Sequence, residues 1–195
     1  MQIIKHRCNS SLDLHKVDCS FGVEIDIRSN GNELILQHDP FASGETLLSW
    51  IKSYSHKTLI LNVKEEGLEE RLLKLMRQYS IEDFFFLDQS FPFLLKTIKQ
   101  GERRCAIRIS EYESIETALS LAGKVDWVWI DYFSYFPLDI VSACALQKAG
   151  FKICIVSPEL QGYPEEIYIP KLRTMLQEKN IVIHAVCTKN PQLWL

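Results

Sequence analysis

The 195-residue sequence lacks several features that would each point to a particular class of protein. It has no basic excess, since 22 Lys and Arg stand against 25 Asp and Glu for a net charge of -3. Nucleic-acid-binding proteins usually carry a clustered basic face, so no nucleic-acid partner is expected. No apolar run approaches the roughly 20 residues of a membrane span, so no membrane-spanning segment is expected. No secretory signal precedes the first apolar run, which makes the cytoplasm the expected compartment.

The cysteines lack the spacing of a metal or redox motif. The six stand at positions 8, 19, 105, 144, 154 and 187, with no C-x-x-C pair among them. Three of them, Cys105, Cys154 and Cys187, lie in apolar runs, where thiols pack as small hydrophobic groups. These are expected to be reduced and structural. Cys8 differs because it directly follows a His-Arg pair, and it is a candidate to line a site there.

What is present is typical of one globular domain. Apolar residues make up 47% of the chain and charged residues 24%, as in ordinary globular proteins. The length allows one well-packed domain and is short for two. We therefore expect a single domain over residues 1–195.

Short apolar runs alternate with segments of helical periodicity along the whole chain. Residues 68–79, for example, have apolar positions at 68, 72, 73, 75 and 76, which is helical spacing. The expected strands are 2–6, 23–27, 58–63, 84–87, 105–109, 127–130, 152–156 and 181–186. The expected helices are 10–17, 46–54, 68–79, 91–99, 114–121, 138–149 and 165–179, with Ser90 as the N-cap of the fourth.

This alternation predicts an α/β fold with parallel strands and helical crossovers. Eight such units close into a TIM-type (β/α)8 barrel. An open sheet is the alternative, because a barrel typically needs about 250 residues. Asn30-Gly31 between two apolar runs predicts a β-hairpin. Residues 33–38 would then form an extra hairpin arm after the second strand.

Polar residues stand repeatedly at the ends of apolar runs in the first 64 residues. Catalytic groups of an α/β barrel sit at the C-terminal ends of its strands, so this placement is typical of a barrel active site. Two histidines and two carboxylates together offer an acid/base pair and ligands for a divalent metal. The four strand-end motifs are His6-Arg7, Glu24-Ile25-Asp26, His38-Asp39 and Asn62-Val63-Lys64.

The second of these motifs places two carboxylates on one side of a strand. Side chains alternate along a strand, so Glu24, Asp26 and Arg28 share a face. Inside a barrel, the carboxylate pair would cost several kcal/mol unless neutralised. A hard cation such as Mg²⁺ or Ca²⁺ would neutralise it. The alternative is an exposed edge strand with a polar outer face.

The two histidines also end apolar runs. A single histidine in such a place is usually structural. His6 and His38 flank a carboxylate pair, however, and imidazole titrates near the working pH, so acid/base catalysis is a second interpretation.

Taken together, the four strand-end motifs resemble the glycerophosphodiester phosphodiesterase family and, more broadly, the phospholipase-C-like phosphodiesterases. In that family an H-R-G opening and a later H-D supply the catalytic histidines, and an E-x-D strand supplies metal ligands. An E-x-K strand end adds a third carboxylate and a lysine. The resemblance of the motifs covers residues 1–64. Beyond residue 64 it depends on the alternation of strands and helices alone.

The resemblance implies a role for each matching residue. His6 and His38 would be catalytic, and Glu24, Asp26 and Asn62 would bind Mg²⁺ or Ca²⁺. The phosphate of a small-molecule phosphodiester would be bound by Arg7, Lys64 and a third cation, Arg108.

The sequence departs from the family pattern at two positions. Cys8 replaces the glycine of H-R-G, and Asn62 replaces the third carboxylate. An asparagine oxygen can ligate Mg²⁺ or Ca²⁺ but brings no charge. The metal would bind more weakly, unless Asp88 or Glu65 compensates.

The expected function is a metal-dependent phosphoric diester hydrolase or lyase that acts on a glycerophosphodiester-like compound, with a place in lipid metabolism. Two alternatives stay open. One is a barrel that binds phosphate or a phosphodiester but has lost turnover, as the Asn62 substitution suggests. The other is an aldolase-like barrel with Lys64 as a Schiff-base lysine, which would leave both histidines unexplained.

Overall fold

A computed structural model describes all 195 residues, which divide into two compact units. The N-terminal unit is Lys5–Glu102, and the C-terminal unit combines Met1–Ile4 with Arg103–Leu195. The expectation of one domain over the whole chain stays a prediction.

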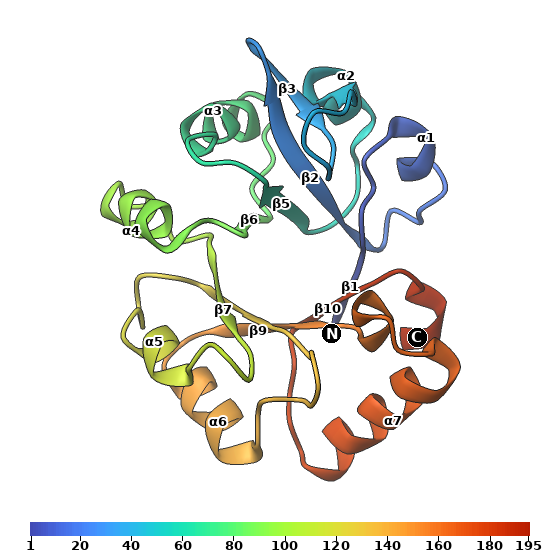
Figure 1. Cartoon of the computed structure of the whole chain (residues 1–195), viewed down its shortest axis with the longest axis vertical. Coiled ribbons are helices and arrows are strands. Elements are labelled where there is room, and N and C mark those ends of the chain that lie inside the picture. The colour runs from blue at the N-terminus through green and yellow to red at the C-terminus, as the bar shows by residue number, and fades with distance from the viewer. The chain divides into compact units, whose positions relative to one another are not determined.

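The sheet of the N-terminal unit is built around strand β2 (Gly22–Asn30), its longest strand. On one side β2 pairs in parallel with β5 (Leu59–Val63), which pairs in parallel with β6 (Phe84–Leu87). On the other side β2 pairs antiparallel with β3 (Glu33–Leu36), and β3 with the short β4 (Glu45–Thr46). Strand β2 therefore lies between the parallel strands β5 and β6 and the antiparallel strands β3 and β4 (Figure 1).

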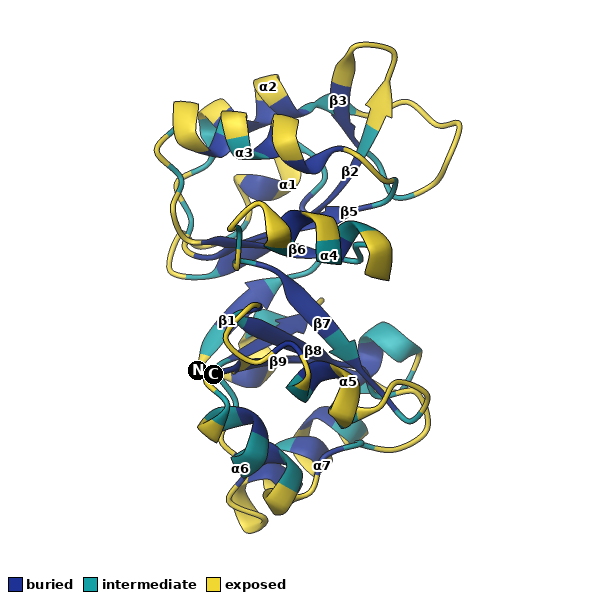
Figure 2. Cartoon of the chain, turned by 90° about the vertical axis from the view of Figure 1, so that its left-hand side faces the viewer, coloured by how far each residue is buried: buried dark blue, intermediate teal, exposed yellow.

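The strands β5 and β6 of this unit are buried along their whole length, as the dark blue ribbons of Figure 2 show. Strands covered on both faces read as continuous apolar runs, which is why these segments are apolar at every position except Asn62. The helices of the unit are α1 (Ser11–Leu14), α2 (Leu47–Trp50) with a 3₁₀ turn at Ile51–Ser53, α3 (Glu69–Gln78) and α4 (Phe91–Lys99).

The predicted hairpin is present between β2 and β3. Asn30 pairs with Glu33, and Gly31 between them has a φ of 58°, in the left-handed region that the turn requires. The tip is exposed, whereas the body of β2 is buried. The extra arm after the second strand is thus as predicted.

The C-terminal unit contains a parallel sheet of β7 (Ala106–Ile109), β8 (Trp127–Ile130), β9 (Lys152–Val156) and β10 (Ala185–Thr188), in that order. Strand β1 (Gln2–Lys5) lies beside β10. The helices are α5 (Ile115–Leu119), α6 (Ile140–Lys148) and α7 (Glu165–Glu178), with 3₁₀ turns at Pro158–Gln161 and Pro191–Trp194. This unit alternates strand and helix as predicted.

One local prediction is wrong, and a second is confirmed only in its position. The last strand begins at Ala185 and not at 181, because Ile181 donates its backbone N–H to Leu176 at the end of α7. Ser90 stands at the N-cap position of α4, but its side chain makes no capping bond there. Its hydroxyl donates instead to Glu66.

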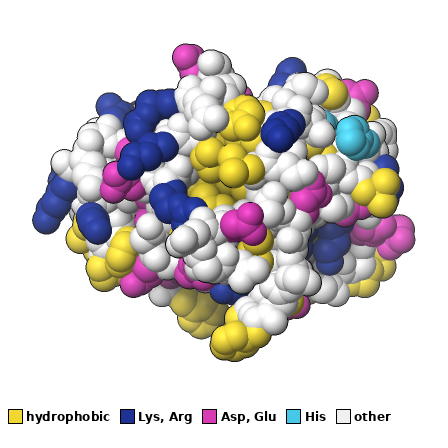
Figure 3. Space-filling view, turned by 90° about the horizontal axis from the view of Figure 1, so that it is seen from above, with side chains coloured by type: hydrophobic (Ala, Val, Ile, Leu, Met, Phe, Trp, Pro, Cys, Tyr) yellow, Lys and Arg dark blue, Asp and Glu magenta, His cyan; other side chains and the backbone are white.

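The surface carries charges of both signs. On the face shown in Figure 3, acidic and basic side chains are interspersed, and apolar side chains gather between them. No helix has both the length and the apolar character required to cross a membrane. This agrees with the absence of long apolar runs from the sequence.

A capping bond at α5 provides a test of the helix boundaries. The Ser114 side chain accepts a hydrogen bond from the backbone N–H of Thr117. Ser114→Ala should lower the free energy of unfolding by about 0.5–2 kcal/mol in urea denaturation, because an N–H loses its partner. Ser134→Ala is the control, since Ser134 is exposed and its side chain makes no hydrogen bond. Equal losses from the two variants would contradict the assigned cap.

Candidate functional site

The two carboxylates of the E-x-D motif lie in the middle of the N-terminal unit. Glu24 is 1% exposed and Asp26 is fully buried. Their strand, β2, has neighbours on both sides and is not an edge strand. The alternative of a polar, solvent-facing edge strand is therefore wrong.

Glu24 is surrounded by hydrogen-bond donors from two other segments. Its Oε2 accepts from the backbone N–H of Arg7 at 2.7 Å, and its Oε1 accepts from Asn62 Nδ2 at 2.8 Å. His6 Nε2 lies 3.9 Å from Oε2. Burial and the nearby charge of Asp26 raise the pKa of Glu24 to about 7, although these two hydrogen bonds act in the opposite direction.

Asp26 is neutralised by two cationic side chains. Lys64 Nζ lies 3.2 Å from its Oδ1, and Arg7 Nε lies 3.6 Å from its Oδ2. The Oδ1 contact is an ion pair without hydrogen-bond geometry. The chain thus brings two of the predicted phosphate-binding residues to the carboxylate pair.

Asn9 is a member of this site that the sequence did not reveal. Its Nδ2 donates to Asp26 Oδ2 at 2.8 Å, and its Oδ1 accepts from the Asp26 backbone N–H at 2.9 Å. Both ends of one amide therefore fix one residue of β2. In the sequence, only its position three residues after His6 indicated that Asn9 could belong to the site. Asparagine is common in such loops, so this position alone did not distinguish it.

The backbone at Arg7 is bent so that the residue can make both contacts. Its φ of 54° is unusual for a residue with a side chain. In this conformation the backbone N–H reaches Glu24 while the guanidinium lies beside Asp26. A strained conformation at such a place is typical of functional sites.

Lys64 links the carboxylate pair to the next strand. Besides Asp26, its Nζ contacts Asp88 Oδ2 at 3.1 Å. Asp88 directly follows β6 and has a φ of 61°. A third carboxylate is therefore present near the site, one strand away from Asn62.

His38 lies just beyond the antiparallel strand β3, which pairs with β2. The residue before it, Gln37, donates its backbone N–H to the Asp26 carbonyl at 3.0 Å. His38 Nδ1 lies 2.7 Å from Asp39 Oδ1, and 38% of the His38 side chain is exposed. The second histidine is thus solvent-accessible and hydrogen-bonded to a carboxylate.

The site fits a hard cation in its donor chemistry. Asp26 and Asn62 are register partners on β2 and β5, and Asn62 Oδ1 is a buried oxygen without a hydrogen-bond partner. No cluster of three His, Cys, Asp or Glu side chains is arranged to hold a metal. A cation here would therefore take the Asn62 amide oxygen together with the carboxylates of Glu24 and Asp26.

Two other candidates have different surroundings from those expected. Cys8 is fully buried, and its thiol contacts the Lys5 carbonyl, so it does not line the site. Burial raises the pKa of this thiol to about 12. Arg108 lies on β7 in the C-terminal unit, where it forms an ion pair with Asp131. Its contact with a phosphate stays a prediction.

Comparisons with known proteins show the fold. Neither protein-family models nor curated proteins match the sequence. A glycerophosphodiester phosphodiesterase from Agrobacterium tumefaciens is similar in structure, with a TM-score of 0.70 and 13% identity over 100% of this chain and 98% of that one. A glycerophosphoryl diester phosphodiesterase from Parabacteroides distasonis has a TM-score of 0.67 and 13% identity, over 97% of this chain and 83% of that one. A third structure, also from A. tumefaciens and provisionally given the latter name, has a TM-score of 0.71 and 14% identity over 99% and 95% of the two chains.

The likeness confirms the predicted fold class. The chain has the α/β barrel fold of these phosphodiesterases, as the alternation of strands and helices predicted. The hairpin arm predicted from Asn30-Gly31 is present as β2 and β3. At such low identity, the likeness establishes the fold and leaves the activity to be argued from the site.

The charge balance of the site can be tested without a substrate. In chelator-treated protein, Lys64→Met should lower the free energy of unfolding by about 3 kcal/mol, because it removes a partner of a buried carboxylate. Urea denaturation measures this. Lys74→Met is the control, since both side chains of the Lys74–Glu70 ion pair are exposed. A loss no larger than that of the control would mean that Lys64 does not neutralise Asp26.

Proposed function

We propose that this chain is a metal-dependent phosphoric diester hydrolase or lyase that acts on a glycerophosphodiester-like small molecule. The observation that carries the proposal is the convergence of His6, Glu24, Asp26, Asn62 and Lys64 within the N-terminal unit. The fold is that of proteins named as phosphodiesterases for such compounds. A fold alone would not carry the proposal.

His38 has the surroundings of a general base. Because a carboxylate only accepts hydrogen bonds, the short contact with Asp39 requires a proton on Nδ1. Nε2 is then left to take a proton from the attacking hydroxyl, supplied by water or by a neighbouring alcohol of the substrate.

His6 would supply the proton of the departing alcohol. Its Nε2 lies 3.9 Å from the Glu24 carboxylate, so the imidazole stands at the carboxylate pair, where the proposal needs a proton donor. In the proposed reaction His6 protonates the leaving oxygen while His38 accepts a proton.

The cationic side chains would bind the phosphate and offset charge that grows on its oxygens. Lys64 is 15% exposed and Arg7 45%, so both can reach solvent while they contact Asp26. Fixed cations at such a place stabilise a transition state without reorganisation.

Glu24, Asp26 and Asn62 would hold the Mg²⁺ or Ca²⁺ ion. When bound, the ion supplies Lewis-acid polarisation of a phosphoryl oxygen. The two carboxylates would supply its charged ligands, and the Asn62 amide ties β5 to Glu24.

The second candidate is a barrel that binds phosphate without turnover. Asn62 favours it, because the site contains one carboxylate fewer than the family pattern. The Schiff-base alternative is less favoured, because the Lys64 amine is engaged with both Asp26 and Asp88.

Metal titration tests the ligand set. Calorimetry with Mg²⁺ and with Ca²⁺ should show one site, and Asn62→Glu should tighten it at least about tenfold because it adds a charged oxygen ligand. Asp26→Ala should abolish binding. Equal or weaker binding by Asn62→Glu would mean that position 62 does not face the ion.

Substitution of the histidines tests the chemistry. His6→Ala and His38→Ala should each lower kcat by about 10²–10⁴, with far smaller changes in KM, if each transfers a proton in the transition state. The assay is hydrolysis of a bis-aryl phosphodiester and then of glycerophosphodiesters, with each metal. The control is His15→Ala, an exposed histidine after α1.

The pair would be structural if both variants turned over like the parent. If the parent is inert on every diester but binds phosphate, the non-catalytic barrel is the better interpretation.

A further inference from the structure

Arg28 occupies the next inward position on β2 after Glu24 and Asp26. Because side chains alternate along a strand, it shares their face. Its strand lies between β3, which leads to His38, and β5, which leads to Lys64. Arg28 is therefore the residue of β2 from which one side chain can reach the ends of both neighbouring strands.

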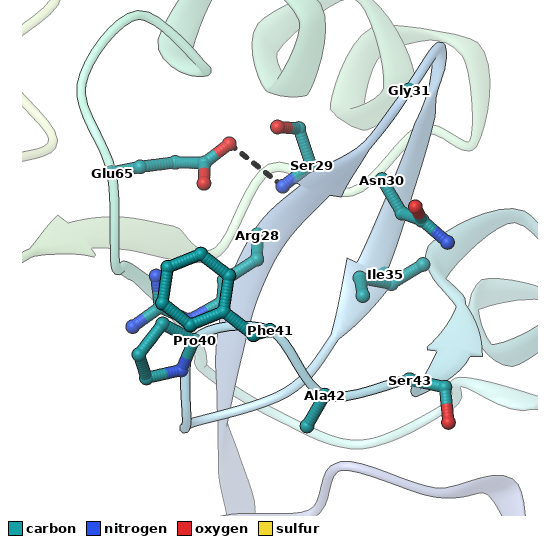
Figure 4. Close-up of a pocket in the computed structure, with 10 residues that line it drawn as sticks. All are labelled: Arg28, Ser29, Asn30, Gly31, Ile35, Pro40, Phe41, Ala42, Ser43 and Glu65. Carbon is teal, nitrogen blue, oxygen red and sulfur yellow. Dashed lines mark hydrogen bonds between the residues drawn. The ribbon is translucent and has the colours of Figure 1, made fainter.

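The guanidinium of Arg28 bonds to the backbone on both sides. Nε and Nη2 donate to the His38 carbonyl at 3.1 and 2.9 Å, and Nη1 donates to the Lys64 carbonyl at 3.2 Å. These donors all belong to one rigid plane, so the two carbonyls are held at a set separation. Figure 4 shows Arg28 beside Pro40 and Phe41, which belong to the segment that follows His38.

The backbone at His38 lies one residue beyond the last backbone hydrogen bond to β2, which runs from Gln37 to Asp26. Strand β3 ends at Leu36, so the sheet ladder does not extend to His38. The chain continues into an exposed segment, Pro40–Ser43, that borders a cavity of about 630 Å³ together with Arg28. Lys64 likewise lies just beyond the end of β5, although its backbone N–H is bonded to Ile27.

We infer that Arg28 is a positioning residue, which holds the main chain of His38 and Lys64 so that an imidazole and an ammonium face one phosphate. This rests on the proposed function, because it assigns those two residues to the reaction. Arg28 itself acts through the backbone of its neighbours. Displacement of a catalytic group by about 1 Å can cost about 100-fold in rate, so such a residue has a measurable effect.

Arg28→Lys tests the inference most directly, because it keeps the positive charge and removes the planar guanidinium that bonds to both carbonyls. The matched control is Arg173→Lys in the C-terminal unit, since Arg173 also bonds two carbonyls, those of Leu193 and Leu195. We expect Arg28→Lys to lower kcat by about 10–100-fold, with a much smaller change in KM. The control should keep the parent kcat. Arg28→Gln serves as a second variant if Arg28→Lys does not fold.

A second measurement does not need activity. ¹⁵N relaxation measures the backbone order parameters of the His38 and Asp39 amides. These should be about 0.85 in the parent, as in rigid backbone, and lower in Arg28→Lys. They should be unchanged in Arg173→Lys.

Unchanged order at His38 in both Arg28 variants would overturn the inference, whatever the activity. So would a parent-like kcat in both variants, provided that His38→Ala is impaired. If the parent turns over no diester, the proposed function fails, and the relaxation data alone decide whether Arg28 positions His38.

Discussion

Two carboxylates, Glu24 and Asp26, are buried on one face of the central strand β2, and the arrangement of the N-terminal unit depends on how their charge is compensated. Removal of a carboxylate from water costs several kcal/mol unless donors and cations replace the lost solvent. Here the donors come from segments far apart in the chain, namely residues 7–9 and 62–64. The same contacts that neutralise β2 therefore also assemble the candidate site.

Asn62 changes the balance of this arrangement. The immediate cations, Arg7 and Lys64, match the two carboxylates in number. With an amide at position 62, the site holds one negative charge fewer than it would with a carboxylate there. Asp88 brings negative charge back from the next strand, but through Lys64 and not beside Asn62. The third carboxylate near the site therefore lies one strand away from position 62, at Asp88.

Much of this was visible in the sequence, for identifiable reasons. The bounds of β6, β8, β9 and α4 agree with those predicted, because apolar runs and turn residues delimit them locally. The Glu24–Asp26 face followed from strand alternation. The role of Asn9 could not be predicted, because it depends on contacts between distant segments. Asp88 was a candidate in the sequence, but its contact with Lys64 was not predicted. Ile181 was misassigned to a strand because its backbone caps α7.

The length of β2 explains how one strand serves several purposes. Nine residues give it enough inward positions for two carboxylates and, beyond them, an arginine. The carboxylates attract side chains from neighbouring segments, whereas Arg28 binds the main chain where those neighbours leave the sheet. A strand that ended before residue 28 would keep Glu24 and Asp26 and lose the hydrogen bonds from Arg28 to the His38 and Lys64 carbonyls. Similar structures share only 13–14% identity with this chain, so the fold permits wide variation in sequence. A function for this chain is therefore inferred from local features, and above all from the polar face of β2 formed by Glu24, Asp26 and Arg28.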